Sequence, residues 1–74
     1  MTAAAWRIVT SSLIRAVAYD ERSRELRIRF ANGSVYRYQG VPGDVAAELV
    51  DPAEGSSGRY FNDRIRDVFD FDEE

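Results

Sequence analysis

The chain has 74 residues, of which 13 are acidic and 10 are basic, and its formal net charge is −3. It contains no cysteine and no histidine, and every basic residue is arginine, which excludes disulfides, thiolate or imidazole zinc sites, cysteine nucleophiles and Schiff-base lysines. We therefore expect one small domain that is not an enzyme and holds no cofactor. No stretch approaches the roughly 18 apolar residues of a membrane span, and no leader-like segment opens the chain, so we expect a cytoplasmic protein.

Charge is distributed unevenly along the chain. Residues 1–40 hold seven arginines against three acidic residues, and residues 41–74 hold three arginines against ten. The first part can therefore present a local basic face, although the overall acidity counts against indiscriminate binding to nucleic acid. The exclusive use of arginine is explained either by compositional bias, which we favour, or by selection for bidentate contacts to phosphate.

The first 19 residues predict an arm or short edge strand, followed by the first strand of the sheet. We expect residues 1–10 to form an arm or a short edge strand, and residues 11–19 to form the first strand of the sheet. Ile14, Val17 and Tyr19 share one face only if a residue between them is bulged. The charged residues 20–24 then predict a turn.

The segment Glu25–Tyr38 predicts a β-hairpin. Apolar residues alternate with arginines, Asn32-Gly33 can form a tight turn, and a β-branched and aromatic run returns. A two-residue loop would place Arg37 on the apolar face, where an unpaired guanidinium costs several kcal/mol or more. A three-residue loop, 31–33, places Tyr36 there instead. We prefer this bulged register, in which Ile28 faces Tyr36.

Two helices are expected after the hairpin. The first begins near Pro42, has apolar residues at helical spacing and stops at Asp51-Pro52. The second is capped by Ser56 or Ser57, and the sequence does not decide between them. The apolar stripe of the second helix consists of Phe61, Ile65, Val68 and Phe69.

The expected fold class is α+β, with a three-stranded antiparallel β-meander covered on one face by two short helices. The domain spans residues 11–69, and we expect residues 70–74 to be an acidic, solvated and frayed tail. The expected core consists of Ile14, Val17, Tyr19, Leu26, Ile28, Phe30, Tyr36, Val45, Leu49, Phe61 and Ile65.

Short motifs follow one another in a fixed order along nearly the whole chain. They are Ser11-Ser12-x-Ile14, Val17-x-Tyr19-Asp20, Leu26-x-Ile28-x-Phe30 with Asn32-Gly33, Tyr36-x-Tyr38, Val41-Pro42, and Ser57-Gly58-x-Tyr60-Phe61-Asn62 with Ile65-Arg66. Together they resemble the KTSC domain family, a module found at the C-terminus of some lysyl-tRNA synthetases and as free-standing small proteins. The chain departs from the family at Ala18, where glycine is frequent, and in a slightly longer segment between Leu49 and Gly58. The resemblance implies a small module, and its attachment to a synthetase suggests RNA binding.

The hairpin supplies the first candidate site. We expect Arg27, Arg29 and Arg37 to form its outward face, where they either contact phosphates or serve as an ordinary solvated surface. Tyr36 and Tyr38 either stack on RNA bases or pack in the core, and we favour the core.

The start of the second helix supplies another candidate. Ser57, Gly58 and Arg59 combine free backbone N–H groups, the positive end of the helix dipole and a guanidinium, which is the outline of an anion site. An ordinary helix cap explains the same residues more simply. Asn62 and Arg66, four residues apart, could extend this surface or bond to each other.

Our first functional hypothesis is a non-enzymatic, translation-associated module that binds RNA, either tRNA or a single strand. The alternative is a protein-interaction module or a small homodimer in which Trp6 or Phe71 buries against a partner.

Overall fold

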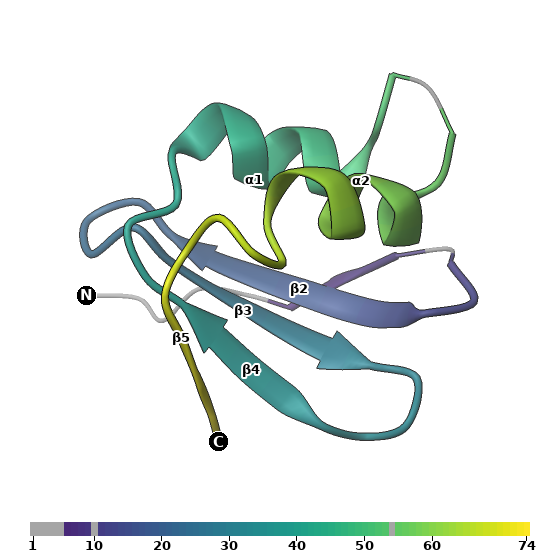
Figure 1. The fold of residues 1–74 in the computed structure, drawn as a ribbon, viewed down its shortest axis with the longest axis horizontal. Helices are drawn as coiled ribbons and strands as arrows, with labels where there is room; N and C mark the ends of the chain where they lie inside the picture. Colours follow the sequence, from purple (N-terminus) through teal and green to yellow (C-terminus); the bar gives the residue numbers. More distant parts are fainter. Residues whose placement is uncertain (1–5, 10, 54) are drawn as a thin grey trace.

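The computed structural model describes residues 6–9, 11–53 and 55–74. In these ranges a five-stranded antiparallel sheet is covered on one face by two helices (Figure 1). The elements are β1 (Arg7–Ile8), β2 (Ile14–Asp20), β3 (Glu25–Phe30), β4 (Val35–Tyr38), α1 (Gly43–Val50), α2 (Ser57–Arg64) and β5 (Phe71–Glu73). The predicted α+β class is confirmed. The sheet differs from the expected three strands because β1 and β5 extend its two edges, in the order β1-β2-β3-β4-β5.

The central hairpin has the bulged register. Ile28 pairs with Tyr36, and Arg27 pairs with Arg37. Gly33 has φ +93 and donates its N–H to the carbonyl oxygen of Phe30 at 2.9 Å. The three-residue loop is therefore confirmed, and it leaves the arginines of the hairpin on the side of the sheet that faces away from the helices.

The first strand contains the predicted bulge. Ile14 pairs with Phe30 and Ala16 pairs with Arg29, so Arg15 is the extra residue on β2. This irregularity turns Ile14 to the same side as Val17, and both side chains are buried. At the outer edge of β2, Arg7 and Ile8 pair with this strand as β1, which agrees with the edge-strand alternative for the described part of residues 1–10.

Both helices begin as expected, but the second ends early. Ser56 is the N-cap of α2, since its Oγ accepts a hydrogen bond from the backbone N–H of Arg59 at 3.2 Å. The chain leaves the helical conformation at Ile65, which is still buried. Val68 is 61% exposed, so its predicted place in the apolar stripe is wrong. The reason is the turn after α2, which breaks the helical spacing.

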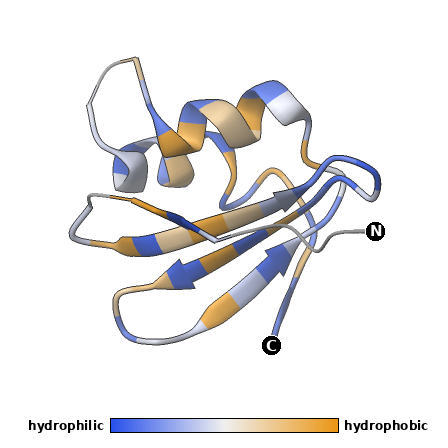
Figure 2. Cartoon of the chain, turned by 180° about the vertical axis from the view of Figure 1, so that it is seen from behind, coloured by the Kyte–Doolittle hydropathy of each residue, from blue (hydrophilic) through white to orange (hydrophobic). Residues whose placement is uncertain are grey.

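The core lies between the sheet and the helices, and the strands carry the alternating hydropathy that such a two-layer arrangement needs (Figure 2). Most of the expected core is buried: Ile14, Val17, Leu26, Ile28, Leu49, Phe61 and Ile65. The remaining expected members are partly buried and pack against it: Tyr19, Phe30, Tyr36 and Val45. The core also contains residues that were absent from the expected core set: Val9, Val41, Ala46 and Tyr38, for which the core was nevertheless the favoured alternative.

The acidic C-terminus forms a strand. Gln39 donates its N–H to the carbonyl oxygen of Asp70 at 2.9 Å, and Glu74 donates its N–H to that of Val35 at 2.8 Å. The expectation of a frayed tail is therefore wrong. It considered only the charged side chains, which are indeed exposed, and not the free edge of β4, whose main-chain groups pair readily with another strand.

Candidate nucleic-acid interface

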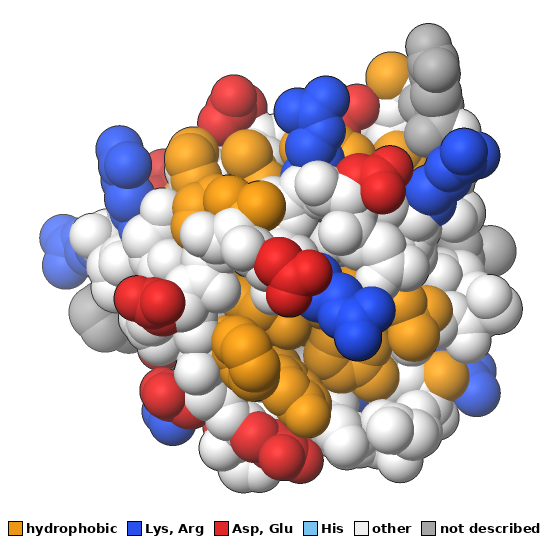
Figure 3. Space-filling model, in the orientation of Figure 1, with side chains coloured by type: hydrophobic (Ala, Val, Ile, Leu, Met, Phe, Trp, Pro, Cys, Tyr) orange, Lys and Arg blue, Asp and Glu red, His pale blue; other side chains and the backbone are white. Residues whose placement is uncertain are grey.

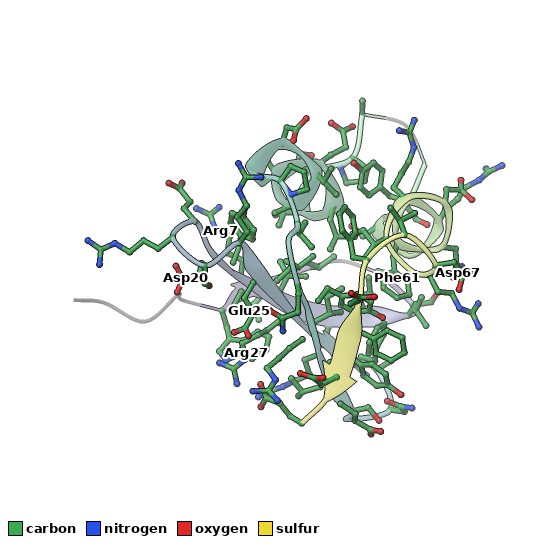
Figure 4. The ribbon with its side chains drawn as sticks, turned by 60° about the vertical axis from the view of Figure 1, so that its left-hand side comes forward. Arg7, Asp20, Glu25, Arg27, Phe61 and Asp67 are labelled. Atoms are coloured by element: carbon green, nitrogen blue, oxygen red, sulfur yellow. The ribbon has the colours of Figure 1, made fainter. Side chains whose placement is uncertain are left out.

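The outer surface of the hairpin carries three guanidinium groups, and we call Arg27, Arg29 and Arg37 the arginine face. Strand alternation places them opposite the buried Leu26 and Ile28. Figure 4 shows Arg27 on the other side of the sheet from Phe61, which projects from α2. The predicted outward orientation of these arginines is thus confirmed.

An indole ring lies on the arginine face. The Cζ atom of Arg27 is 5.2 Å from the centre of the Trp6 ring, and that of Arg29 is 4.8 Å from it. These are cation–π distances, and they hold two like charges beside one aromatic ring. Trp6 therefore packs on its own sheet, where it is partly buried.

Carboxylates of the C-terminal strand neutralise part of the arginine face. Arg27 donates from Nε to Oε2 of Glu74 at 2.6 Å and from Nη2 to Oε1 at 2.9 Å. This hydrogen bonding lowers the pKa of the Glu74 carboxyl and raises the pKa of Arg27. Arg37 Nη2 lies 3.5 Å from Oδ2 of Asp72, while Arg37 Nε is buried without an acceptor among the described residues.

A groove of about 670 Å³ opens on the opposite side of β4, and we call it the aromatic groove. Its aromatic wall consists of Phe30, Tyr36, Tyr38, Phe61 and Phe71. Its polar lining includes Asn32, Ser34, Arg66 and Asp67. Figure 3 shows hydrophobic side chains gathered at the centre of this face, next to a basic and an acidic side chain.

The aromatic groove exposes some rings and buries others. Tyr36 and Tyr38 are nearly parallel at 6.4 Å, and Phe71 lies 5.4 Å from the first ring and 5.3 Å from the second. Tyr38 is only 3% exposed, and burial, with a smaller contribution from Tyr36, raises its pKa to about 12. The core interpretation therefore holds for Tyr38. Tyr36 is half-buried, and Phe71, at 51% exposure, offers the most open ring.

The start of α2 is a packing junction. Ser57 and Gly58 are buried, and a Cβ added to Gly58 would lie 3.2 Å from Leu13 Cβ and 3.3 Å from Ser11 Oγ. This close contact leaves no open surface over the two residues, so the structure does not support the anion site expected there. Arg59 is exposed on the far side of the helix, where it lines a separate hollow with Glu48 and Tyr60.

The predicted RNA-contacting residues thus lie in three places. Arg27, Arg29 and Arg37 form the arginine face, Tyr36, Tyr38 and Arg66 line the aromatic groove, and Arg59 and Asn62 are exposed on α2. The sequence analysis missed the contacts that Phe71, Asp72 and Glu74 make with the first two places. The signal was available in the alternation Phe69-Asp70-Phe71-Asp72, which has the period of a strand.

The described part of the chain offers no cluster of histidine, cysteine, aspartate or glutamate that could hold a metal ion. Within the same residues, neither helix has the length and apolar character needed to cross a membrane. The surfaces described above present guanidinium groups beside aromatic rings.

Comparison with known proteins agrees with this fold. The sequence model of the KTSC domain matches residues 10–69. The chain belongs to the KTSC domain family. An uncharacterized protein of Stutzerimonas stutzeri is 38% identical to this KTSC domain over 52 residues, which cover 70% of each chain. The crystal structure of a KTSC domain protein from Yersinia pestis superposes with a TM-score of 0.86 at 32% identity, covering 97% of this chain and 99% of that one.

A third relative connects this KTSC domain with a larger protein. A lysine–tRNA ligase of Nostoc punctiforme is 39% identical to it over 62 residues, which cover 84% of this chain and 11% of the ligase. The resemblance noted from the sequence motifs is confirmed, including the occurrence of the domain in a lysyl-tRNA synthetase.

Proposed function

We propose that this KTSC domain is a non-enzymatic, cytoplasmic module that binds single-stranded RNA on the β3–β4 hairpin. The observation that carries the proposal is the bidentate pairing of Arg27 with a carboxylate, at 2.6 and 2.9 Å. Arginine holds phosphate with the same planar fork of two N–H groups. The arginine face is thus built to receive oxyanions, and in this chain two of its three guanidiniums already do so.

Aromatic rings border this oxyanion surface on both sides of the sheet. Trp6 lies against Arg27 and Arg29, and Tyr36 with Phe71 lines the aromatic groove on the other side of β4. Stacking of bases on exposed aromatic rings beside basic groups is the usual way to hold a single strand without reading its sequence. We assign phosphate contacts to the arginines and base stacking to Trp6 and Tyr36.

Similarity to a lysine–tRNA ligase supports RNA as the ligand class, because such a ligase acts on tRNA. The acidic second part of the chain opposes strong binding. We therefore expect weak affinity that declines steeply as salt screens the arginines.

The experiment is a titration of labelled single-stranded RNA, followed by fluorescence anisotropy at several salt concentrations. If three to five phosphates are engaged, log affinity should fall against log salt with a slope of about −2 to −3.5. Replacing Arg27 and Arg29 by glutamine should flatten this slope by about one unit or more. The control variant replaces Arg22 and Arg64 by glutamine. Both arginines are exposed but lie off the hairpin surface, so this variant should keep the salt slope of the unmodified protein. Equal slopes in the two variants would remove the arginine face from RNA binding.

A protein-interaction module is the second candidate. It is favoured by Phe71, which is half-exposed at the mouth of the aromatic groove, the kind of ring that anchors a partner. RNA titrations without any binding at low salt would favour this alternative.

A further inference from the structure

One short strand contacts both surfaces of the proposed RNA site. On the groove side, the ring of β5 residue Phe71 packs against Tyr36 and Tyr38. On the outer side, Asp72 and Glu74 pair with Arg37 and Arg27. Because side chains alternate along a strand, a single segment reaches the rings and the guanidiniums at once.

The chemistry of β5 matches what the proposed ligand would present. The carboxylates of Asp72 and of Glu74, the residue after β5, meet guanidiniums as phosphates would, and the Phe71 ring packs on Tyr36 and Tyr38 as a base would. The match with Arg37 is incomplete, since its Nη2 is 3.5 Å from Asp72 and its buried Nε has no acceptor among the described residues. A ligand with more acceptor oxygens could satisfy this group.

The attachment of β5 is suited to release. The strand has three residues, all of them exposed, and is flanked by the main-chain bonds of Gln39 and Glu74. Short segments with few buried contacts open at low free-energy cost, and solvent-exposed ion pairs add little. The remaining strands do not need to rearrange when β5 leaves, because among the described strands it pairs only with β4.

We infer that β5 is an intramolecular competitor of RNA. Residues 71–74 occupy the Arg27, Arg37 and Tyr36 surfaces in cis, and binding of a single RNA strand displaces them from the edge of β4. This inference rests on the proposed function. As a consequence, the observed affinity for RNA equals the affinity of the open form multiplied by the fraction of molecules in which β5 is unpaired.

The first test compares two double variants that remove the same charge. Asp72→Asn with Glu74→Gln removes the carboxylates that face the arginines. Asp44→Asn with Asp63→Asn removes two exposed carboxylates of α1 and α2 that lie outside residues 71–74. Long-range electrostatics acts equally on both variants. We expect the first variant to bind single-stranded RNA about three- to tenfold more tightly than the second.

The second test follows the strand itself in the unmodified protein. The Glu74 amide donates to Val35, so its hydrogen exchange reports whether the C-terminal segment is paired. We expect faster exchange of this amide in the RNA complex than in the free protein.

The outcomes of these tests distinguish competition by β5 from RNA binding itself. Equal affinity of the two double variants, or an unchanged Glu74 amide in the complex, would overturn competition by β5 while leaving RNA binding intact. Absence of RNA binding in all three proteins at low salt would overturn the proposed function, and the competition with it.

Discussion

Phe61 is the side chain that joins the helical layer to the aromatic rings of the sheet. It is buried, and its ring meets Phe30 at 5.2 Å and Tyr38 at 5.6 Å, both nearly edge to face. Removal of the ring leaves a cavity between layers that cannot fully close. We expect Phe61→Ala to lower the free energy of unfolding by about 3–5 kcal/mol, which would threaten a domain of this size.

Urea or thermal unfolding measures this loss. Val68→Ala is the matched control, because this side chain lies nearby in the chain but is largely exposed, and its truncation should change stability by less than about 0.5 kcal/mol. Similar small losses in both variants would show that Phe61 is not a core residue.

Tyr38 should be the last tyrosine to ionise. Burial, with a smaller contribution from Tyr36, raises its pKa to about 12 in the folded protein. A raised pKa means that the neutral hydroxyl stabilises the fold. This contribution is fully present below the ordinary pKa of an unfolded tyrosine, about 10, and is lost as the pH rises through about 12.

An ultraviolet absorbance titration measures this ionisation. Tyr38→Phe should remove the latest step of the curve, whereas Tyr36→Phe should leave a late step in place. A Tyr38→Phe curve that retains the latest step would assign the high pKa to another residue.

Single residues of the hairpin could be predicted where burial of charge decides between alternatives. The cost of burying Arg37 favours the register that turns Tyr36 inward, and the structure has this register. The position of Trp6 could not be predicted in this way. Its contact with Arg27 and Arg29 joins residues that are more than 20 positions apart in the sequence. Local alternation of apolar and polar residues does not predict a contact of this kind.

At the scale of elements, length separates what could be predicted from what could not. The strands β2 and β3 have seven and six residues, enough for alternation and a bulge to be recognised. In contrast, β5 has only three residues and exists because β4 leaves an edge free. The early end of α2 was missed for a related reason, since Val68 and Phe69 continue an apolar pattern after the helix has stopped.

The junction between α2 and the segment before β2 gives a prediction at this scale. A methyl group on Gly58 would crowd Leu13 and Ser11, at 3.2 and 3.3 Å, whereas one on Gly43, at the start of α1, would meet Tyr19 only at 3.9 Å. Alanine normally stabilises a helix relative to glycine by up to about 1 kcal/mol. We expect Gly43→Ala to be neutral or stabilising and Gly58→Ala to destabilise by about 1–2 kcal/mol.

Chemical denaturation of the two alanine variants compares them directly. A stabilising Gly58→Ala would mean that the segment containing Ser11 and Leu13 yields without cost, and that the start of α2 is not the tight junction described here.

At the scale of the whole molecule, the uneven charge of the chain is explained by its folding. The acidic C-terminal residues return to the basic hairpin, where Glu74 and Asp72 pair with Arg27 and Arg37. The net charge of −3 therefore describes a molecule whose basic surface is partly covered by its own acids. We therefore expect the proposed RNA binding to depend on local arrangement and on salt, and not on total charge.

The central claim is that the β3–β4 hairpin surface binds single-stranded RNA. The most direct measurement is a titration with RNA followed by amide chemical shifts, together with the indole signal of Trp6, at low and at high salt. We predict shifts of the indole and of amides in β3, β4 and β5 at low salt, and their loss at high salt. Absence of shifts on the hairpin at low salt, or shifts confined to α1 and the exposed side of α2, would contradict the claim.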